Sequence, residues 1–396
     1  MSVLSDYERE TAPLPGRSHA LPLRAYSDSE VFDLEMERVF RRDWIGICGA
    51  AELPNAGDYY ALAVADEPIV VIRGSDGVLR CLSNVCRHRG TVLYDEGRGN
   101  ASSIQCPYHA WSYDNSGRLT GVPYPGNAVI DKASHGLAAI RLETWKDIVF
   151  INLDADAQPL APRLAGLDRY VDNFQYGRFE SSPPMKVESW NANWKLIMEN
   201  GMDWYHLFNV HPETLDPIAP TRDAFNVEGS PRWTVTASRQ PHATPKRQDD
   251  PPSLGAFERE HYLVLSIPPN IVFFANADAW SWLLMLPQSA DRTLVCGGGR
   301  FSKHQDGPAA AELNNNDRIM EEDRILCERV QKGMSARHGR GGQLIELDRA
   351  IKDFHHYLGW RLFDHELAEA WQAKVEPERI GSSKASYASE KTHYVK

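Results

Sequence analysis

The sequence has few cysteines, no long hydrophobic run and no excess of basic residues. Six cysteines in 396 residues are too few for the disulfide framework of a small secreted protein. The longest apolar runs, at 67–72 and 147–153, are far shorter than a membrane span and are typical of buried strands. The net charge is −11, with acidic and basic residues interspersed along the chain. We therefore expect no membrane insertion and no nucleic-acid binding.

The sequence also lacks a leader segment and a nucleotide-binding motif. Residues 1–30 contain no apolar core flanked by positive charge, which argues against a secretory signal and favours a cytoplasmic location. The glycine-rich run CGGGRF at 296–301 follows a strand-like stretch but opens no helical pattern. We therefore expect no flavin or nicotinamide site in this chain.

Length and patterning predict two domains that follow a short N-terminal segment. The proline- and serine-rich residues 1–30 are expected to form an irregular arm, and the apolar spacing in 28–44 predicts a helix. Over residues 44–154, short β-rich runs alternate with Gly, Asp and Asn turns, which indicates an antiparallel β-domain. Hairpin turns are predicted at 75–77 and 115–117.

The rest of the chain combines helical patterns with strand-like runs, which indicates an α+β domain with an antiparallel sheet. Helices are predicted at about 193–208, 309–334 and 345–374, and strands at 261–267, 279–287 and 292–301. The predicted domain limits are 1–43, 44–154 and 155–396, with a linker near 154–162. The first segment is expected to pack on the last domain.

Two motifs in the β-domain each pair a cysteine with a histidine. Cys86-x-His88 is followed, seventeen residues later, by Cys106-x-x-His109. Both pairs lie at the ends of predicted strands, beside turns, where two loops can meet over one metal centre. A single Cys or His is most often an incidental or buried residue, but two such pairs in one β-domain indicate a metal site.

Two cysteines and two histidines permit two kinds of centre. One is zinc. The other is a two-iron, two-sulfide cluster in which the cysteines hold one iron and the histidines hold the other. A C2H2 finger carries both histidines on one helix, whereas here each loop supplies one Cys and one His. Zinc-finger geometry therefore fits poorly, although zinc itself stays open at this point.

A second constellation, NWKLIMENGMDWYHLFNVH at 193–211, contains Asp203, His206 and His211. In an ideal helix His206 and His211 would lie about 140° apart, so they can share a metal only if the helix bulges or ends between them. Asp203 and His206 are three residues apart and would share a helix face. Pro212 disfavours a helical conformation of His211, which supports a helix end before it. Core packing is the competing interpretation for histidines on an aromatic-rich segment.

Together the two motifs resemble those of the Rieske non-haem iron oxygenases, in the large catalytic alpha subunit of ring-hydroxylating dioxygenases and Rieske monooxygenases. The resemblance implies a [2Fe–2S] cluster with Cys86 and Cys106 on one iron and with His88 and His109 on the other. The second N–H of each histidine would then lie at the surface, so the resemblance implies an electron-donor docking site around His88, His109 and Tyr108. The resemblance covers nearly the whole chain, but its specificity lies in the two motifs.

In the second motif the resemblance implies a mononuclear Fe(II) held by His206, His211 and a carboxylate. This ligand set leaves the opposite face of the metal open for O2 and substrate. The segment 314–333 resembles the one that supplies the carboxylate, and we predict Asp323. By resemblance, Asp203 bridges His206 to a cluster histidine of a neighbouring subunit; orienting His206 is the alternative role. Four other acids share the segment, and most of its acids are expected to be solvated surface residues: Asp317, Glu321, Glu322 and Glu328.

The resemblance implies a fold with an N-terminal Rieske β-domain and a helix-grip-like catalytic domain. It implies a terminal oxygenase that hydroxylates or oxidatively demethylates a small organic substrate, such as an aromatic acid or a methylated or quaternary amine. Electrons would come from NAD(P)H through a separate reductase, with or without a ferredoxin. The implied assembly is a homotrimer, with or without a small beta subunit. The alternatives are a Rieske-type electron carrier without oxygenase chemistry and a dihydroxylating dioxygenase that needs a beta subunit.

A pocket beside the iron is predicted from apolar and aromatic residues of the C-terminal domain, and Trp204 is expected to narrow it. The candidate lining residues, for each of which core packing is the competing and favoured interpretation, are Trp204, Phe208, Leu265, Ile267, Phe273, Trp280 and Trp282.

Overall fold

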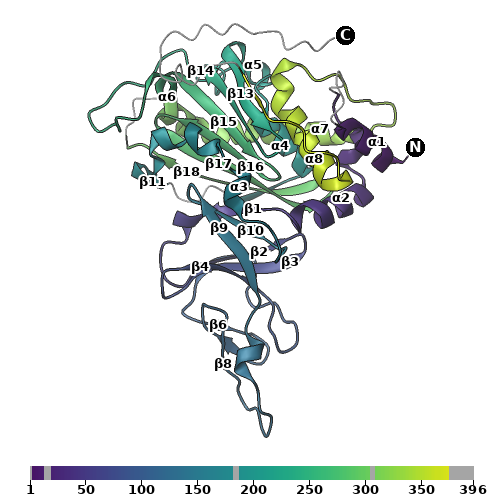
Figure 1. Cartoon of the computed structure of the whole chain (residues 1–396), viewed down its shortest axis with the longest axis vertical. Coiled ribbons are helices and arrows are strands. Elements are labelled where there is room, and N and C mark those ends of the chain that lie inside the picture. Colours follow the sequence, from purple (N-terminus) through teal and green to yellow (C-terminus); the bar gives the residue numbers. More distant parts are fainter. Residues whose placement is uncertain (1, 13–18, 182–186, 304–307, 374–396) are drawn as a thin grey trace. The chain divides into compact units, whose positions relative to one another are not determined.

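The structure is a computed structural model that describes residues 2–12, 19–181, 187–303 and 308–373. The chain divides into two compact units (Figure 1). One unit is Phe40–Gln158; the other combines Met1–Val39 with Pro159–Lys396. Within the described ranges, none of the helices has the length and apolar character needed to cross a membrane. The domain limits predicted from the sequence, 1–43, 44–154 and 155–396, remain a prediction.

The unit Phe40–Gln158 is built from antiparallel β-strands. Its larger sheet has the strand order β1-β10-β9-β4-β3-β2-β5, and a small second sheet has the order β6-β7-β8. The strands of the larger sheet are β1 (Ile45–Gly49), β2 (Asp58–Val64), β3 (Glu67–Arg73), β4 (Leu79–Ser83), β5 (Gly97–Asn100), β9 (Ala139–Trp145) and β10 (Ile148–Asn152). Those of the smaller sheet are β6 (Ile104–Gln105), β7 (Ser112–Tyr113) and β8 (Leu119–Gly121).

Both predicted hairpin turns of this unit are confirmed. Gly77 (φ +77°) lies in the turn between β3 and β4, and Gly117 (φ +87°) lies in the turn between β7 and β8. Both adopt the left-handed conformation that glycine tolerates without steric cost. The apolar core of the unit includes Cys86 and Cys106, so both cysteine loops contribute a side chain to it.

The other unit contains a long antiparallel sheet with the order β11-β18-β17-β16-β15-β14-β13-β19, and β12 also pairs with β18. Its strands are β11 (Glu180–Ser181), β12 (Val187–Trp190), β13 (Ala224–Ser230), β14 (Trp233–Arg239), β15 (His261–Ile267), β16 (Ile271–Asn276), β17 (Ala279–Ser289), β18 (Arg292–Phe301) and β19 (Trp371–Gln372). The three predicted strands correspond to β15, β17 and β18. The predicted α+β class is therefore confirmed.

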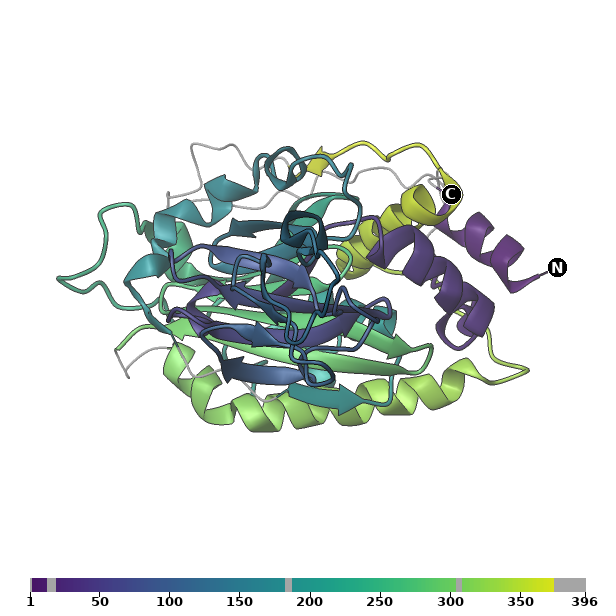
Figure 2. The same ribbon diagram turned by 90° about the horizontal axis from the view of Figure 1, so that it is seen from below.

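Helices accompany this sheet within the same unit. They are α1 (Val3–Thr11), α2 (Ser29–Glu35), α3 (Leu160–Arg163), α4 (Trp194–Met202), α5 (Leu207–Val210), α6 (Ala256–Glu260), α7 (Pro308–Met334) and α8 (Arg349–Phe363). The long helix α7 runs alongside the sheet (Figure 2). Helix α4 packs against both α7 and the strands β15, β16 and β17. The unit therefore places α4 and α7 over one stretch of the sheet.

Two sequence-based expectations about this unit were wrong. Residues 1–30 are not simply an irregular arm, because α1 forms there with Ser2 as its N-cap and buries Tyr7 against Phe363 (ring centroids 5.5 Å apart). The predicted helix at 345–374 ends earlier, at Phe363, because Asp364 adopts the left-handed conformation (φ +55°). The helix predicted in 28–44 is confirmed as α2, with Asp28 accepting a hydrogen bond from the N–H of Glu30 (3.1 Å).

Candidate metal sites

The two cysteine loops of the β-unit are built alike. Cys86 and Cys106 are both buried. Four residues after each cysteine, a residue in the left-handed conformation donates its N–H to the cysteine carbonyl oxygen: Gly90 (φ +75°) to Cys86 and Ala110 (φ +56°) to Cys106, both at 3.0 Å. A left-handed alanine is sterically costly. The second loop therefore keeps the geometry of the first even without a glycine.

The two histidines lie side by side at the outer end of these loops. The ring centroids of His88 and His109 are 4.7 Å apart, and His88 stacks on Trp111 with the ring planes 5° from parallel. His88 is exposed and His109 half-buried. The Nδ1 atom of His109 is buried and has no hydrogen-bond partner in the described part of the chain. A buried, unpaired imidazole nitrogen close to two buried thiols fits a metal cluster at this position.

Hydrogen bonds around the Cys106 thiol favour its deprotonated form. Burial raises the pKa of the Cys106 thiol, but the backbone N–H groups of Tyr108 and His109 donate to it and shift its pKa below the usual value. The hydroxyl of Tyr113 lies 3.3 Å from the Cys86 sulfur and accepts a hydrogen bond from the N–H of Arg87 (3.0 Å). Thiolates are the form that binds metal. Sequence reasoning missed Tyr113, which comes from β7 rather than from either loop.

Arg89 has a clear contact at the rim of this site. It donates a hydrogen bond to the Tyr108 hydroxyl (3.1 Å), and its guanidinium lies over the Tyr108 ring, 4.9 Å from the centroid. Tyr108 is exposed. The arginine therefore holds an exposed aromatic side chain beside His109, at the surface where a docking site was predicted.

In the other unit, the helix that carries the second motif is interrupted before His206, and the short helix after the break ends before His211, as predicted. Helix α4 ends at Met202, Asp203 has extended backbone angles (φ −90°, ψ 121°), and α5 begins at Leu207. His206 and His211 flank this short second helix, and their ring centroids are 5.1 Å apart. Asp203 and His206 therefore meet across a turn and not on the face of a helix.

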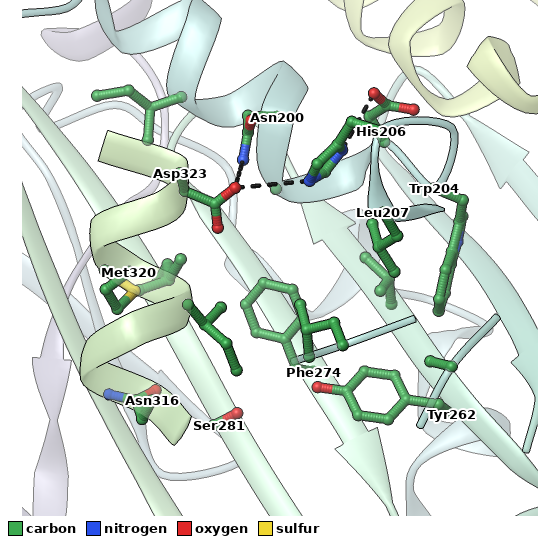
Figure 3. Close-up of a pocket in the computed structure, with 18 of the residues that line it drawn as sticks. Asn200, Trp204, His206, Leu207, Tyr262, Phe274, Ser281, Asn316, Met320 and Asp323 are labelled. Atoms are coloured by element: carbon green, nitrogen blue, oxygen red, sulfur yellow. Dashed lines mark hydrogen bonds and ion pairs between the residues drawn. The ribbon is translucent and has the colours of Figure 1, made fainter. Parts of the chain in front are cut away.

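Asp323 from α7 completes a group of three possible ligands with these histidines. Its Oδ1 atom lies 3.0 Å from His211 Nε2 and 3.5 Å from His206 Nε2. One ligand atom from each residue falls within 4.8 Å of the other two. Figure 3 shows the Asp323 carboxylate directed toward the His206 ring. Two imidazoles and one carboxylate form the ligand set that suits non-haem Fe(II).

Polar side chains hold the outer nitrogens of both histidines and one oxygen of the Asp323 carboxylate. His206 Nδ1 lies 3.2 Å from Asp203 Oδ2, and Asn200 donates to Asp323 Oδ1 (2.8 Å). His211 Nδ1 lies 2.8 Å from Glu322 Oε2, so Glu322 is not one of the solvated acids of α7. Carboxylates on the far nitrogen of a ligating histidine set its tautomer and ring orientation. Sequence reasoning missed Asn200, although it lies one helical turn before Asp203.

The charges of this group are strongly coupled. Burial opposes ionisation of Asp323, but hydrogen bonds from His206 and His211 and their charges hold its pKa well below the usual range. Burial also opposes protonation of His206, yet the hydrogen bonds to Asp203 and Asp323 raise its pKa to about 9. The carboxylates thus attract protons to the imidazoles. A divalent cation between these ligands satisfies the same electrostatic demand.

His206 and Asp323 lie at one end of a cavity whose atom-free space, including open solvent at its mouth, is about 810 Å³ (Figure 3). Helix α4, the turn after it, the sheet and α7 all contribute to its walls. The larger apolar lining residues are Trp190, Ile197, Trp204, Leu207, Leu215, Tyr262, Val264, Phe274, Trp282, Leu283, Ile319 and Met320. Trp204 is fixed as a wall because its indole N–H donates to Thr236 Oγ1 (2.7 Å).

The predicted pocket lining was largely wrong. Of the seven predicted residues only Trp204 and Trp282 line the cavity, and Phe208 is 53% exposed. The others are core residues that alternate along the strands with the residues that do line it: Leu265, Ile267, Phe273 and Trp280. Side chains of a strand point alternately to opposite faces. A shift of one residue along β15 and β16 therefore exchanges the core face for the cavity face, whereas β17 contributes three consecutive residues, Ser281–Leu283, to the lining.

Comparisons with known proteins match both units. Residues 43–145 match the family model of the Rieske [2Fe-2S] domain, and residues 168–363 match that of the ring hydroxylating alpha subunit (catalytic domain). A [2Fe–2S] cluster rather than zinc is therefore the cofactor of the β-unit.

Relatives with curated functions are oxygenase subunits. The carnitine monooxygenase oxygenase subunit of Escherichia coli K12 is 30% identical over 364 residues, which cover 87% of this chain and 94% of that protein. The glycine betaine monooxygenase oxygenase subunit of Chromohalobacter salexigens is 31% identical over 245 residues, or 62% of this chain. That second alignment spans only about half of the relative's length, 55%.

A solved structure shares the fold over most of the chain. The crystal structure of a quaternary ammonium Rieske monooxygenase in complex with L-carnitine superimposes with a TM-score of 0.72 and 26% sequence identity. The superposition covers 87% of this chain and 95% of that one.

Proposed function

The chain belongs to the Rieske-type ring-hydroxylating oxygenases, and we propose that it is the terminal component, which activates O2. The observation that carries this proposal is the group of His206, His211 and Asp323, which opens on an apolar-walled cavity in a chain that also has a Rieske domain. A protein that only carried electrons would have no use for this group or for the cavity.

We assign the cluster ligands from the geometry of the two loops. Cys86 and Cys106 would hold one iron, and His88 and His109 the other, which agrees with the buried thiols and the unpaired Nδ1 of His109. The mixed thiolate and imidazole ligation suits a cluster that passes electrons onward at a raised potential. The exposed side of His88 and the Arg89–Tyr108 pair mark the surface where we propose that an electron donor docks.

For the catalytic metal, we assign His206, His211 and Asp323 as ligands. When bound there, Fe(II) supplies the redox chemistry that activates O2 with electrons from the cluster. The residues around it prepare the site. Asn200 holds the Asp323 carboxylate (2.8 Å), and Asp203 holds the outer nitrogen of His206 (3.2 Å). The apolar walls limit the access of water to the reacting centre.

We propose hydroxylation or oxidative demethylation of a small organic molecule as the reaction. The apolar and aromatic walls of the cavity beside the proposed ligands support a small organic substrate. The names of the relatives above include monooxygenases of carnitine and of glycine betaine. The electrons would come from NAD(P)H through a separate reductase, with or without a ferredoxin.

We propose a homotrimer as the working assembly. Asp203 is half-buried, and only one of its carboxylate oxygens lies next to His206, while the other accepts the N–H of Tyr205 (2.6 Å). A bridge from Asp203 to a cluster histidine of a neighbouring chain needs a closed head-to-tail ring, which three copies supply. The proposed assembly is this homotrimer, with or without a small beta subunit. We also propose a cytoplasmic location.

Substitution of a catalytic ligand tests the proposed function. We expect His206→Ala to abolish substrate oxidation and coupled O2 consumption while the absorption spectrum of the cluster stays unchanged. His338→Ala, at an exposed position, is the matched control. Unchanged oxidation in the His206 variant would refute the proposed iron site and would favour an electron carrier or another active centre.

A second substitution tests the electron path. Asp203→Asn keeps the shape of the side chain but removes the charge that faces His206 Nδ1. We expect both metals to stay bound and the reduced cluster to be reoxidised much more slowly in a rapid-mixing experiment with O2 and substrate. Wild-type reoxidation rates would leave Asp203 with an orienting role only.

A further inference from the structure

The end of the cavity farthest from the proposed iron ligands carries three neutral polar side chains. They are Tyr262 from β15, Ser281 from β17 and Asn316 from α7. Figure 3 shows them at the opposite side of the pocket from His206 and Asp323, with the Tyr262 hydroxyl directed inward. A molecule that reaches from one end of the cavity to the other therefore meets hydroxyl and amide groups at its far end.

Helix α7 fixes the distance between the two ends. Asn316 and Asp323 both line the cavity and are seven residues apart on one helix, which corresponds to about two turns and roughly 10 Å along the axis. Seven residues also return to nearly the same helix face. The amide of Asn316 and the carboxylate of Asp323 are thus presented to the cavity by one rigid element.

The sheet holds the other two polar groups on one face. Ser281 of β17 is paired with Phe274 of the neighbouring strand β16. Phe274 is in turn paired with Val264 of β15, which lies two residues from Tyr262. All four residues line the cavity. Tyr262 and Ser281 are therefore fixed by strand register, and their hydroxyl groups need little reordering to bind a ligand.

The described lining residues offer no cationic partner to an anionic group at this end. None of them is Lys or Arg, and His206, with the carboxylates Asp203 and Asp323 beside it, belongs to the opposite end of the cavity. A carboxylate or sulfonate placed next to Tyr262, Ser281 and Asn316 would have hydrogen bonds but no opposite charge. Burying an unpaired anion is much more costly than burying a neutral group that is hydrogen-bonded.

We propose that the substrate of this chain carries an uncharged hydrogen-bonding group, such as an amide, hydroxyl or ether, at the end held by Tyr262, Ser281 and Asn316. The opposite end, which is oxidised, is an apolar or methyl-bearing group held between Trp204 and the other apolar walls. The inference rests on the proposed function only for the direction in which the substrate lies. The preference for an uncharged group is a property of the cavity itself.

A pair of matched compounds tests this preference by binding. The metal-loaded, unreduced protein is titrated under anaerobic conditions with 4-methoxybenzamide and with 4-methoxybenzoate, and binding is followed by calorimetry and by tryptophan fluorescence. These compounds have nearly the same shape and differ in charge. Choline and glycine betaine form a second pair with the same contrast. In each pair we expect the compound without the carboxylate to bind at least about tenfold more tightly. Burying the carboxylate without a cationic partner costs about that much in affinity.

Substitutions of the three polar residues test whether these side chains cause the preference for an uncharged group. Tyr262→Phe and Ser281→Ala each remove one hydroxyl and should weaken the binding of the amide about threefold to tenfold, which corresponds to one lost hydrogen bond. Asn316→Lys adds a cation and should reverse the preference in favour of 4-methoxybenzoate. Asn315→Lys, at the neighbouring position of α7 that does not line the cavity, is the matched control and should keep the wild-type preference.

Several outcomes would overturn the inference. They are tighter binding of the anionic member of a pair, equal binding of both members, failure of every uncharged member to bind, or a reversal in the Asn315 control as large as that in the Asn316 variant. Because binding is measured without turnover, loss of the inference is distinguishable from loss of the proposed function. An active oxygenase that prefers anions would refute only the inference.

Discussion

At the scale of single residues, two consecutive acids of α7 hold the two nitrogens of one imidazole. Glu322 Oε2 lies 2.8 Å from His211 Nδ1, and Asp323 Oδ1 lies 3.0 Å from His211 Nε2. Thr214 donates to the same Glu322 oxygen (2.7 Å), so this carboxylate is itself held in place. The orientation of the fully buried His211 ring is therefore set from its outer side before a metal binds.

We predict that Glu322→Gln weakens iron binding about 10-fold to 100-fold, the usual cost of removing the outer partner of a ligating histidine. The amide keeps the size of the side chain but not the charge that faces His211 Nδ1. Affinity can be measured by competition with a chelator. Glu321→Gln is the matched control, because Glu321 is exposed and pairs only with Arg324 in the described structure. Equal affinities in the two variants would contradict this role of Glu322.

The sequence alone supports much of the site, but not all of it. The spacing of the two Cys/His motifs and of the Asp203–His206–His211 motif is local information, so the sequence carries it directly. The partnership of Glu322 with His211 joins positions 111 residues apart and depends on which face α7 presents, which no local pattern reports. The lining of the cavity could not be predicted for a related reason. Apolar residues of β15, β16 and β17 occupy both faces of the sheet, so polar and apolar residues do not alternate along these strands.

At the scale of elements, the glycines of β18 and α7 lie in different steric surroundings. Gly298 in β18 is paired with Trp282 of β17, and a Cβ atom at this position would come within 2.5 Å of the Trp282 ring. Gly333 near the end of α7 has no atom within 4 Å of such a Cβ. The glycine-rich run at 296–301 is thus a strand that accommodates a large aromatic side chain across the sheet.

We predict opposite effects of alanine at these two positions. Gly298→Ala should lower the free energy of unfolding by about 1–3 kcal/mol, because the added methyl group overpacks the contact with Trp282. Gly333→Ala should raise it by about 0.4–1 kcal/mol, because alanine restricts the unfolded chain and favours helix. Urea denaturation measures both values. A neutral Gly298 variant would show that the Trp282 ring can move away at little cost.

Helix α8 contains a histidine that is kept neutral. Burial lowers the pKa of His356 from its usual 6.5 to about 3, and its Nδ1 atom has no hydrogen-bond partner among the described residues. Cationic neighbours act in the same direction: Lys352, His355, Arg349 and His365. As the pH falls through 6.5, the unfolded chain takes up a proton at this position while the folded chain does not. Stability that is present above pH 6.5 is therefore lost on acidification.

We predict that His356→Gln reduces the acid sensitivity of folding. Below pH 6.5 the wild-type free energy of unfolding should fall, relative to that of the variant, by roughly 1.4 kcal/mol per pH unit. Denaturation curves at pH 7.5 and pH 5.5 measure this difference, and other titrating groups cancel because both proteins contain them. Parallel changes with pH in the two proteins would show that His356 is protonated in the folded state.

The elements themselves were predictable where periodicity was strong. The strands β15, β17 and β18 and the helix α7 were expected from their apolar patterns, whereas α1 was missed because a short helix with few apolar residues depends on tertiary contacts such as Tyr7 with Phe363. The end of α8 is set by the backbone conformation of Asp364, which composition does not reveal.

At the scale of the whole molecule, the catalytic unit is assembled from two parts of the chain that flank the Rieske unit in sequence. Glu35, from the segment before it, and Lys195, from the segment after it, form a fully buried ion pair (2.7 Å). Trp194 also donates to the Glu35 carboxylate (2.8 Å). Burial raises the pKa of Glu35 and lowers that of Lys195, and each partner counteracts the shift of the other.

We predict that Lys195→Met lowers the free energy of unfolding by about 3–5 kcal/mol, because it leaves the Glu35 carboxylate buried without its cation. The double variant Glu35→Leu with Lys195→Met should recover part of this loss. Lys332→Met, at an exposed position of α7, is the control. Thermal denaturation measures all three. A small effect of the single substitution would show that Glu35 takes up a proton readily in place of its partner.

Because α7 carries both Asp323 and Asn316, the distance between the proposed iron site and the polar group at the far end of the cavity changes in steps of about one helical turn. The next positions of α7 that line the cavity, about one turn closer to Asp323, are Ile319 and Met320. A polar residue at either position would shorten the recognised span by roughly 4.5–6 Å, about one turn of the helix. Proteins of this design should therefore diverge toward shorter or longer substrates in discrete jumps, even when their sequences change gradually.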